Sequence, residues 1–206
     1  MIISHRFRFI FIKTTKTAGT SLEVQLSPIC PPEDVFTPVI PPEDGHQARN
    51  YIAPDGTEYY NHMDARLVRR LLGEERFKDY FKFCVERDPV DKCVSYYMMK
   101  KHSSTHTNWR WRLMNWHAFV LSGRFPFDHD KYTDHDGSLM VDRILRYENL
   151  NEELSDVFKT LGVPFTGLTT RAKGNHRGPT KPSVTPLHRA RIMHAYAQSN
   201  AYTGYR

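Results

Sequence analysis

The sequence lacks several features that would place it in specialised protein classes. No run of about 18 apolar residues occurs, which excludes a membrane-spanning helix. The short apolar stretch near the N-terminus is interrupted by basic residues and does not fit a secretory signal, so we expect a cytoplasmic protein with no membrane partner. Three cysteines without a close pair exclude a disulfide framework. With 206 residues, we expect a single domain over residues 1–206.

Acidic residues are missing from one end of the chain. The formal net charge is +6, but residues 157–206 contain eight Lys and Arg and no Asp or Glu. A segment of fifty residues with charge of one sign is a candidate anion-binding region, although a solubilising surface would have the same composition.

Apolar patterns predict strands alternating with helices. Residues 6–12, RFRFIFI, are apolar on both faces and predict a buried strand, followed by a tight loop and a helix from Thr20. Residues 81–86 and 139–147 predict two further strands. Helices are expected after the capping residues Asp64 and Asp88 and over residues 109–121 and 151–162. This order predicts an α/β fold with a mainly parallel sheet flanked by helices.

The loop between the first strand and its helix has the composition of a phosphate site. Backbone N–H groups and the helix dipole converge at such a helix N-terminus. The loop adds a cation, a glycine for close backbone approach and hydroxyl donors, in the order Lys16, Thr17, Ala18, Gly19, Thr20, Ser21. Because the lysine precedes the glycine, the GxxxxGK[ST] order of nucleoside triphosphatases is not matched. We expect a phosphate-type ligand held without a metal; a tight turn with a solvated lysine is the alternative.

A second segment has residues that could bind an anion. Arg87 ends the predicted strand 81–86, and Ser95 lies two helical turns further on. Alone, an arginine at a strand end is usually part of a surface ion pair.

Together the two segments resemble a known family. FIFIKTTKTAGTSLE, residues 9–23, resembles the 5′-phosphosulfate loop of sulfotransferases that use 3′-phosphoadenosine 5′-phosphosulfate (PAPS), and VERDPVDKCVSYY, residues 85–97, resembles their 3′-phosphate segment. The similarity runs over residues 6–162 and is closest to carbohydrate sulfotransferases of the heparan 2-O type and their bacterial relatives. Three residues depart from the pattern: Thr15 stands where the family usually has proline, Glu86 where it has a neutral residue or arginine, and Lys92 where arginine is common.

The resemblance implies a P-loop-like three-layer fold and an enzyme that transfers a sulfuryl group from PAPS to an acceptor hydroxyl. The expected acceptor is a carbohydrate, and the other product is 3′-phosphoadenosine 5′-phosphate (PAP). His62 would take the acceptor's proton, with His46 as second candidate, and Lys16 would stabilise the leaving phosphate. The implied cofactor-binding residues are Lys16, Thr17, Ala18, Gly19, Thr20, Ser21, Arg87 and Ser95. A non-catalytic binder of phosphorylated nucleotides or polyanions is the alternative function, and a nucleotide kinase is disfavoured.

Residues 166–182 combine glycines and prolines with five basic side chains and no acid. Mutual repulsion predicts a segment that closes over an anionic cofactor, with Lys173 or Arg177 reaching the 3′-phosphate; a solvated loop is the alternative.

Two other patterns invite a functional interpretation. The cluster His129, Asp130, Asp134, His135 and Asp136 matches neither zinc nor EF-hand spacing, and we expect no metal there. The run NWRWRLMNWH, residues 108–117, could stack on nucleic acid. Because Trp109, Leu113, Trp116 and Val120 share a helical face, we expect a core role and no nucleic-acid partner.

Overall fold

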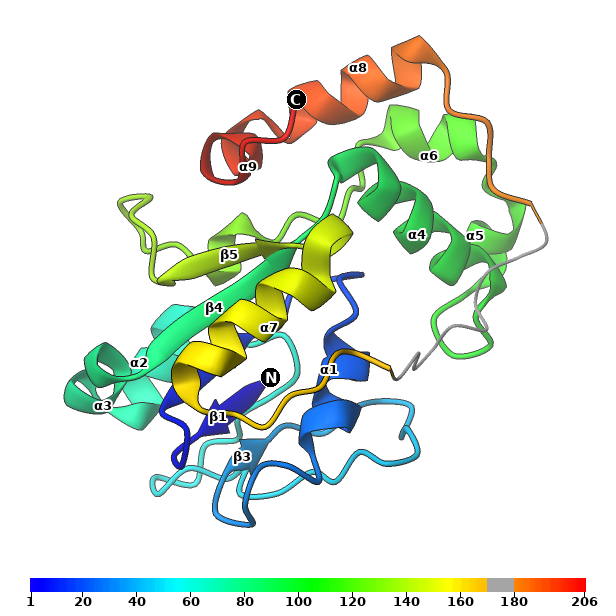
Figure 1. Ribbon diagram of the computed structural model, residues 1–206. Coiled ribbons are helices and arrows are strands. Elements are labelled where there is room, and N and C mark those ends of the chain that lie inside the picture. Colours follow the sequence, from blue (N-terminus) through cyan, green and yellow to red (C-terminus); the bar gives the residue numbers. More distant parts are fainter. Residues whose placement is uncertain (170–179) are drawn as a thin grey trace.

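The computed structural model describes residues 1–169 and 180–206; the predicted cofactor-binding residues Lys173 and Arg177 lie outside them. Its centre is a five-stranded sheet with the order β3-β1-β2-β4-β5 (Figure 1). Strands β2, β4 and β5 are parallel, whereas β1 is antiparallel to both β2 and β3. The strands are β1 (Ile2–Ser4), β2 (Phe9–Ile12), β3 (Val35–Phe36), β4 (Phe81–Glu86) and β5 (Arg143–Arg146).

The sheet is therefore mixed, and the prediction of a mainly parallel sheet is correct only for its centre. The predicted strand 6–12 is shorter than expected, because residues 5–8 form a turn in which Arg8 has a positive φ of 54°. This turn reverses the chain, so that Ile3 pairs with Ile10 in an antiparallel hairpin. A strand of three residues at the chain's start carries too short a pattern to be recognised in the sequence.

Helices cover both faces of the sheet, which confirms the predicted three layers. Phe9 and Phe11 of β2 pack on one face, in a cluster that includes residues of α1 (Gly19–Leu26) and α7 (Leu150–Leu161). Ile10 and Ile12 point to the other face, where they meet α2 (Ala65–Leu72) and α3 (Glu74–Asp79). Because strand side chains alternate between faces, the Phe/Ile alternation of β2 supplies both core layers.

A third apolar cluster lies at one end of the molecule, where α4 (Pro89–His102), α6 (Trp116–Ser122) and α8 (Pro186–Ala195) pack together (Figure 1). The remaining elements are α5 (Trp109–Leu113), α9 (Ala197–Thr203) and the 3₁₀ turns η1 (His129–Lys131) and η2 (Tyr147–Asn149). None of the helices in the described part of the chain is long and apolar enough to cross a membrane.

The predicted helix over 109–121 is broken in two. Met114 is extended, and the Asn115 side chain accepts the N–H of Ala118 to begin α6. As predicted, Trp116 and Val120 are buried. The core role is wrong for Trp109 and Leu113, which are 68% and 77% exposed, because the break ends the helical face that the four residues would have shared.

The predicted helix caps are confirmed. The Asp64 carboxylate accepts the N–H of Leu67 at the start of α2, and the Asp88 carboxylate accepts the N–H of Asp91 at the start of α4. Gly162 ends α7 in the left-handed conformation. Each cap satisfies backbone groups that a helix end leaves unpaired.

Candidate functional site

The loop between β2 and α1 has an unusual backbone. Lys16 and Ala18 have positive φ angles of 62° and 63°, a conformation that non-glycine residues rarely adopt. Ala18 is the N-cap of α1 and provides no side-chain hydrogen bond to the first turn. The loop therefore presents the N-terminus of α1 without a side-chain cap, next to the end of a buried strand, as a phosphate site requires.

Glycine is needed at position 19 for packing within the protein. A Cβ atom there would lie 2.7 Å from Cγ of Lys13. Lys13 is buried beneath the loop, with Nζ 2.5 Å from Glu23 Oε2 and 3.1 Å from the Thr20 hydroxyl. Although burial alone would raise it, the Met1 and Lys13 ammonium groups hold the pKa of Glu23 below its usual value. The close approach expected at this glycine is thus made by the Lys13 side chain.

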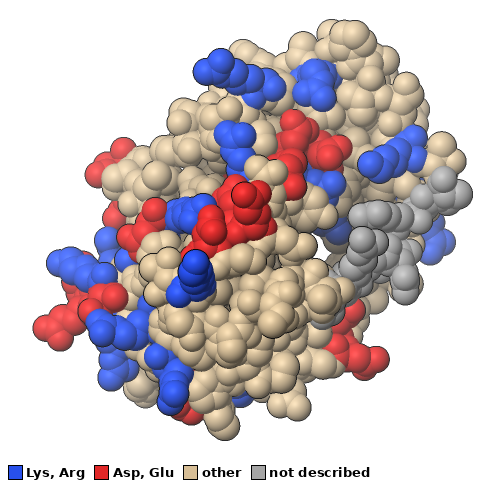
Figure 2. Space-filling view, viewed as in Figure 1, with Lys and Arg blue, Asp and Glu red and all other residues tan. Residues whose placement is uncertain are grey.

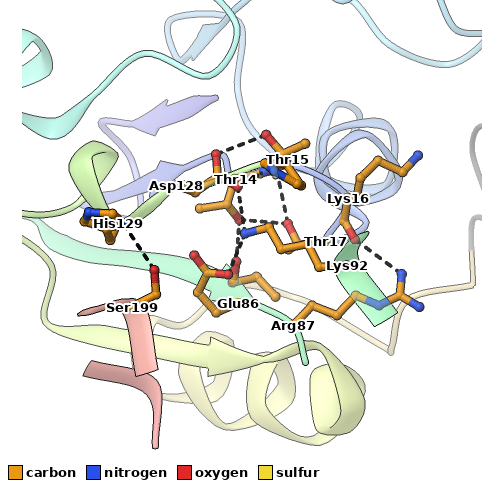
Figure 3. A network of polar contacts seen from close by, with 12 residues as sticks. Thr14, Thr15, Lys16, Thr17, Glu86, Arg87, Lys92, Asp128, His129 and Ser199 are labelled. Carbon is orange, nitrogen blue, oxygen red and sulfur yellow. Dashed lines mark hydrogen bonds and ion pairs between the residues drawn. The ribbon is translucent and has the colours of Figure 1, made fainter. Parts of the chain in front are cut away.

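Arg87 and the loop lie side by side at the ends of β4 and β2. The guanidinium Nη1 donates to the carbonyl oxygen of Lys16 over 3.4 Å (Figure 3). The guanidinium carbon also lies 4.3 Å from the centroid of the Tyr147 ring. The Arg87 Nη2 is 3.6 Å from the Asp91 carboxylate. The Nε atom is buried and has no hydrogen-bond partner within the described residues. A buried donor without an acceptor suits an anionic ligand. Ser95 is half-buried in α4.

His62 lies beside the start of the loop, in the left-handed conformation with φ 64°. Its Nδ1 is 3.0 Å from the carbonyl oxygen of Lys13. Because a carbonyl can only accept, Nδ1 carries the proton and the neutral ring has its lone pair on Nε2. Burial, with the charges of Lys13 and Lys131, lowers the pKa of His62 to about 3. The ring is therefore neutral at physiological pH and has a proton-accepting nitrogen.

This depressed pKa predicts acid sensitivity. Between pH 6.5 and about 3 the unfolded chain binds a proton at His62 that the folded protein does not, so stability falls as the pH is lowered through this range. We expect His62 to cost about 2–3 kcal/mol at pH 4 relative to pH 7. Urea unfolding of wild type and His62→Asn at both pH values measures this. Asparagine is the matched replacement, since its amide can donate to the Lys13 carbonyl and it tolerates the left-handed region. An equal loss of stability in both proteins would contradict the prediction.

His46, the second candidate base, lies close enough to Glu23 and Lys13 for their charges to affect its pKa. Its ring packs edge-on against Phe36 in β3, with 6.3 Å between ring centroids. Strand β3 is separated from β2 by β1, whereas His62 contacts the residue that directly follows β2. A hydrogen bond to the residue that follows β2 is thus observed for His62 and not for His46.

A buried network of charges lies behind the loop (Figure 3). Lys92 Nζ is 2.7 Å from both Glu86 Oε2 and Asp128 Oδ2, and all three side chains are almost fully buried. Burial raises the pKa of Glu86; by contrast, the two carboxylates hold the pKa of Lys92 above its usual value despite burial. Glu86 and Lys92 are two of the three departures from the sulfotransferase pattern, and here they compensate each other.

Asp128 was missed by the sequence analysis. Its pKa is lowered, because the Lys92 and Lys131 charges outweigh the effect of burial. The sequence did show that Glu86, in a buried strand, and Lys92, in the following helix, both depart from the sulfotransferase pattern. Buried charges of this kind need partners of opposite charge. Nothing in the sequence showed that a third partner comes from residue 128.

The C-terminal residues lie near the same strand end. The Tyr205 hydroxyl donates to Glu148 Oε2 over 2.6 Å, and its oxygen lies 3.2 Å from the Glu86 carbonyl oxygen. The other Glu148 carboxylate oxygen accepts the N–H of Asp88, beside Arg87. The segment LRYENL, residues 145–150, therefore supports the backbone that carries Arg87.

A serine, a histidine and an aspartate also occur in line, but they do not form a nucleophilic site. The Ser199 hydroxyl is 3.1 Å from His129 Nδ1, and His129 Nε2 is 3.2 Å from the Asp130 carboxylate. Ser199 is only 4% exposed within α9, so no substrate could reach its hydroxyl. The contact attaches α9 to η1.

The rest of the cluster around residues 129–136 is engaged in surface contacts. Asp134 pairs with Arg69 at 3.1 Å, and His135 Nδ1 is 3.2 Å from an Arg66 nitrogen. Within residues 1–169 and 180–206, no three His, Cys, Asp or Glu side chains are grouped in a way that could hold a metal ion.

The helical end of the molecule is built largely from two stretches of sequence that contain no acidic residue. Residues 92–127 contain no Asp or Glu, and neither do residues 180–206. These two stretches supply most of α4 and all of α5, α6 and α8. On the face seen in Figure 2, the region of α5, α6 and α8 shows Lys and Arg but no acidic side chain. The acid-free C-terminal stretch recognised in the sequence thus packs against a second acid-free stretch, residues 92–127.

Comparison with known proteins gives a relationship but no activity. No model of a known protein family matches the chain. An uncharacterized protein of Archaeoglobus fulgidus is 34% identical over 123 residues, which are 56% of this chain and 98% of the archaeal protein. The two proteins belong to one family. The name of this relative assigns no chemistry, so function must be argued from the site itself.

Proposed function

We propose that the protein is a sulfotransferase that uses PAPS as donor and transfers the sulfuryl group to an acceptor hydroxyl. The observation that carries this proposal is the hydrogen bond between the Arg87 guanidinium and the Lys16 carbonyl. It joins the two segments whose sequences resemble the 5′- and 3′-phosphate sites of PAPS-dependent enzymes. Because β2 and β4 are parallel neighbours, their carboxyl ends meet at one edge of the sheet, where α/β proteins commonly bind ligands.

The residues of this edge fit a ligand with two phosphate groups. The uncapped first turn of α1 and the Lys16 ammonium suit one anion, and Arg87, with its unpartnered Nε, suits the second. The strand, loop and helix would then act like a P-loop in which the lysine precedes the glycine, whereas the usual GK[ST] motif has the lysine after it.

The mechanism assigns one task to each side chain. PAPS, when bound, supplies a sulfuryl group attached to a phosphate leaving group. His62 Nε2 accepts the proton of the acceptor hydroxyl as its oxygen bonds to sulfur and the bond from sulfur to the phosphate oxygen breaks. Lys16 stabilises the negative charge that develops on that phosphate oxygen, and in Figure 3 its side chain extends away from the buried Lys92 network. Arg87, with Ser95, selects the 3′-phosphate.

We propose a sugar hydroxyl as the acceptor. Trp109 is largely exposed on α5, where its indole face could stack on a saccharide ring. The guanidinium carbon of Arg110 lies 5.4 Å from the centroid of the Trp109 ring. Screening acceptors with labelled PAPS tests this: turnover with saccharides supports it, and turnover restricted to phenols contradicts it.

Thermal unfolding with added ligands tests the proposed function directly. PAP should raise the melting temperature more than ADP or ATP does, without added magnesium, because only PAP has a 3′-phosphate for Arg87. Sulfuryl transfer from PAPS then separates an enzyme from a non-catalytic binder. Equal stabilisation by all three nucleotides would contradict a dedicated 3′-phosphate site.

An Arg87→Ala variant should lose affinity selectively. A charge-assisted hydrogen bond contributes about 1.5–3 kcal/mol, so PAP binding should weaken about 10- to 150-fold. Adenosine 5′-phosphate, which lacks the 3′-phosphate, should lose much less. Calorimetric titration of both ligands measures the difference. Equal losses would mean that Arg87 acts through its contact with the Lys16 carbonyl and not through the ligand.

A further inference from the structure

Thr15 is held from outside the loop by one buried carboxylate. Asp128, just before η1, is 1% exposed. Its Oδ2 accepts the backbone N–H of Thr15 at 2.7 Å, and its Oδ1 accepts the Thr15 hydroxyl at 3.0 Å. The two residues are 113 positions apart, and both hydrogen-bond donors of Thr15 are used in this one contact.

The loop needs such an external contact. Lys16 follows Thr15 directly in the left-handed conformation, with φ 62°, which is unfavourable for a non-glycine residue. Strained backbone of this kind persists only where its surroundings fix it. Fixing Thr15 by both N–H and hydroxyl limits how the peptide that leads into Lys16 can rotate.

The same network reaches the second half of the proposed site. Lys92 Nζ bridges Asp128 Oδ2 and Glu86 Oε2, each at 2.7 Å. Glu86 is the last residue of β4 and directly precedes Arg87. Thus one buried ammonium group connects the carboxylate that holds the loop to the strand end that carries the arginine.

Lys131 completes the set of charges around Asp128. Its Nζ contacts Asp128 Oδ1 and lies 3.4 Å from the Thr15 hydroxyl. The Asp128 carboxylate thus has two ammonium groups and two donors of Thr15 on its two oxygens. A buried carboxylate with this many donors is locked in one orientation, which a positioning role requires.

We propose that Asp128 is a positioning residue for the loop at residues 14–18, and that the Asp128–Lys92–Glu86 network fixes the distance between this loop and Arg87. The consequence for nucleotide binding rests on the proposed function, whereas the effect on the loop itself does not. Asp128 does not touch the ligand; it determines where the Lys16 backbone and ammonium are presented.

The test compares Asp128→Asn with a matched control, Asp34→Asn. Asp34 is also a buried carboxylate that accepts backbone N–H groups, of His5 and Arg6, and a hydroxyl, of Ser4. Asp34 holds the turn before β2, and this turn is at the opposite end of the strand from the loop at residues 14–18. Both variants remove one buried carboxylate charge. Asp128 also pairs with Lys92 and Lys131, so urea unfolding should show a larger loss of stability for Asp128→Asn, and exchange outside the loop measures that general effect.

Hydrogen exchange in peptides covering residues 14–21 and calorimetric titration with PAP are the two measurements. In Asp128→Asn we expect exchange at least about tenfold faster across this loop and PAP binding at least about tenfold weaker, as for loss of one charge-assisted bond. Asp34→Asn should change neither. Unchanged loop exchange in folded Asp128→Asn would overturn the proposal.

A second variant keeps the proposal testable if Asp128→Asn does not fold. Thr15→Val removes the contacts of the hydroxyl with Asp128 and Lys131 and leaves the N–H bond and the buried charges in place. Loop exchange should then be faster by about twofold to tenfold, and unchanged exchange would again overturn the proposal. If wild-type protein does not bind PAP, the proposed function fails, while the exchange results still decide the role of Asp128.

Discussion

A His62→Asn variant should keep the fold at pH 7 and lose about 10²-fold in turnover, the low end of the range for removing a general base, because a pKa of about 3 makes His62 a weak base at that pH. The structure gives the reason. The hydrogen bond from Nδ1 to the Lys13 carbonyl leaves the lone pair on Nε2, and the asparagine amide can replace the donor but has no basic nitrogen.

For the proposed activity, the same geometry predicts how the rate of the wild-type protein depends on pH. With its pKa near 3, His62 remains unprotonated from pH 5 to 8, so the rate should show no acid limb near the ordinary histidine pKa of about 6.5. His46→Asn is the matched control and should retain turnover, because His46 packs against Phe36 in the edge strand β3. Full activity of His62→Asn, or a limb near pH 6.5 that this variant leaves in place, would contradict the assignment.

Replacing Lys16 by alanine should lower turnover at least about a hundredfold. One preorganised charge donor at a transition state is commonly worth about 2.7–4 kcal/mol. Lys16 follows the residue that Asp128 fixes, and its carbonyl is held by Arg87, so the backbone that carries its ammonium group is anchored on both sides. Loss of the ammonium should therefore act on the chemical step more than on the fold.

Steady-state rates with PAPS, measured beside thermal unfolding, check this prediction. Lys78→Ala is the matched control, since Lys78 is an exposed lysine on α3 whose recorded partner is Glu74 in the same helix. It should leave both turnover and stability nearly unchanged. A folded Lys16→Ala protein with turnover within a few-fold of wild type would remove Lys16 from the mechanism.

Local sequence patterns were sufficient for most elements around the site. The Phe/Ile alternation of residues 9–12 identified a strand buried on both faces, and Asp64 and Asp88 marked helix starts where side-chain caps are observed. These features depend on residues within a few positions of one another, so the chain itself encodes them. The juxtaposition of the Lys16 loop with Arg87 was also predictable, because it follows from parallel strands that end at one edge.

The remaining features depended on contacts between distant residues. The hairpin of β1 and β2, the break at Met114 and the burial of Lys13 beneath Gly19 have no local pattern long enough to reveal them. Most clearly, the sequence alone determined that Glu86 and Lys92 were charged residues in buried elements, and so in need of partners. Only the tertiary structure decided that Asp128 is the third member and that it also holds Thr15. A buried charge is stable only beside an opposite charge, and the packing of the whole chain determines which residue supplies it.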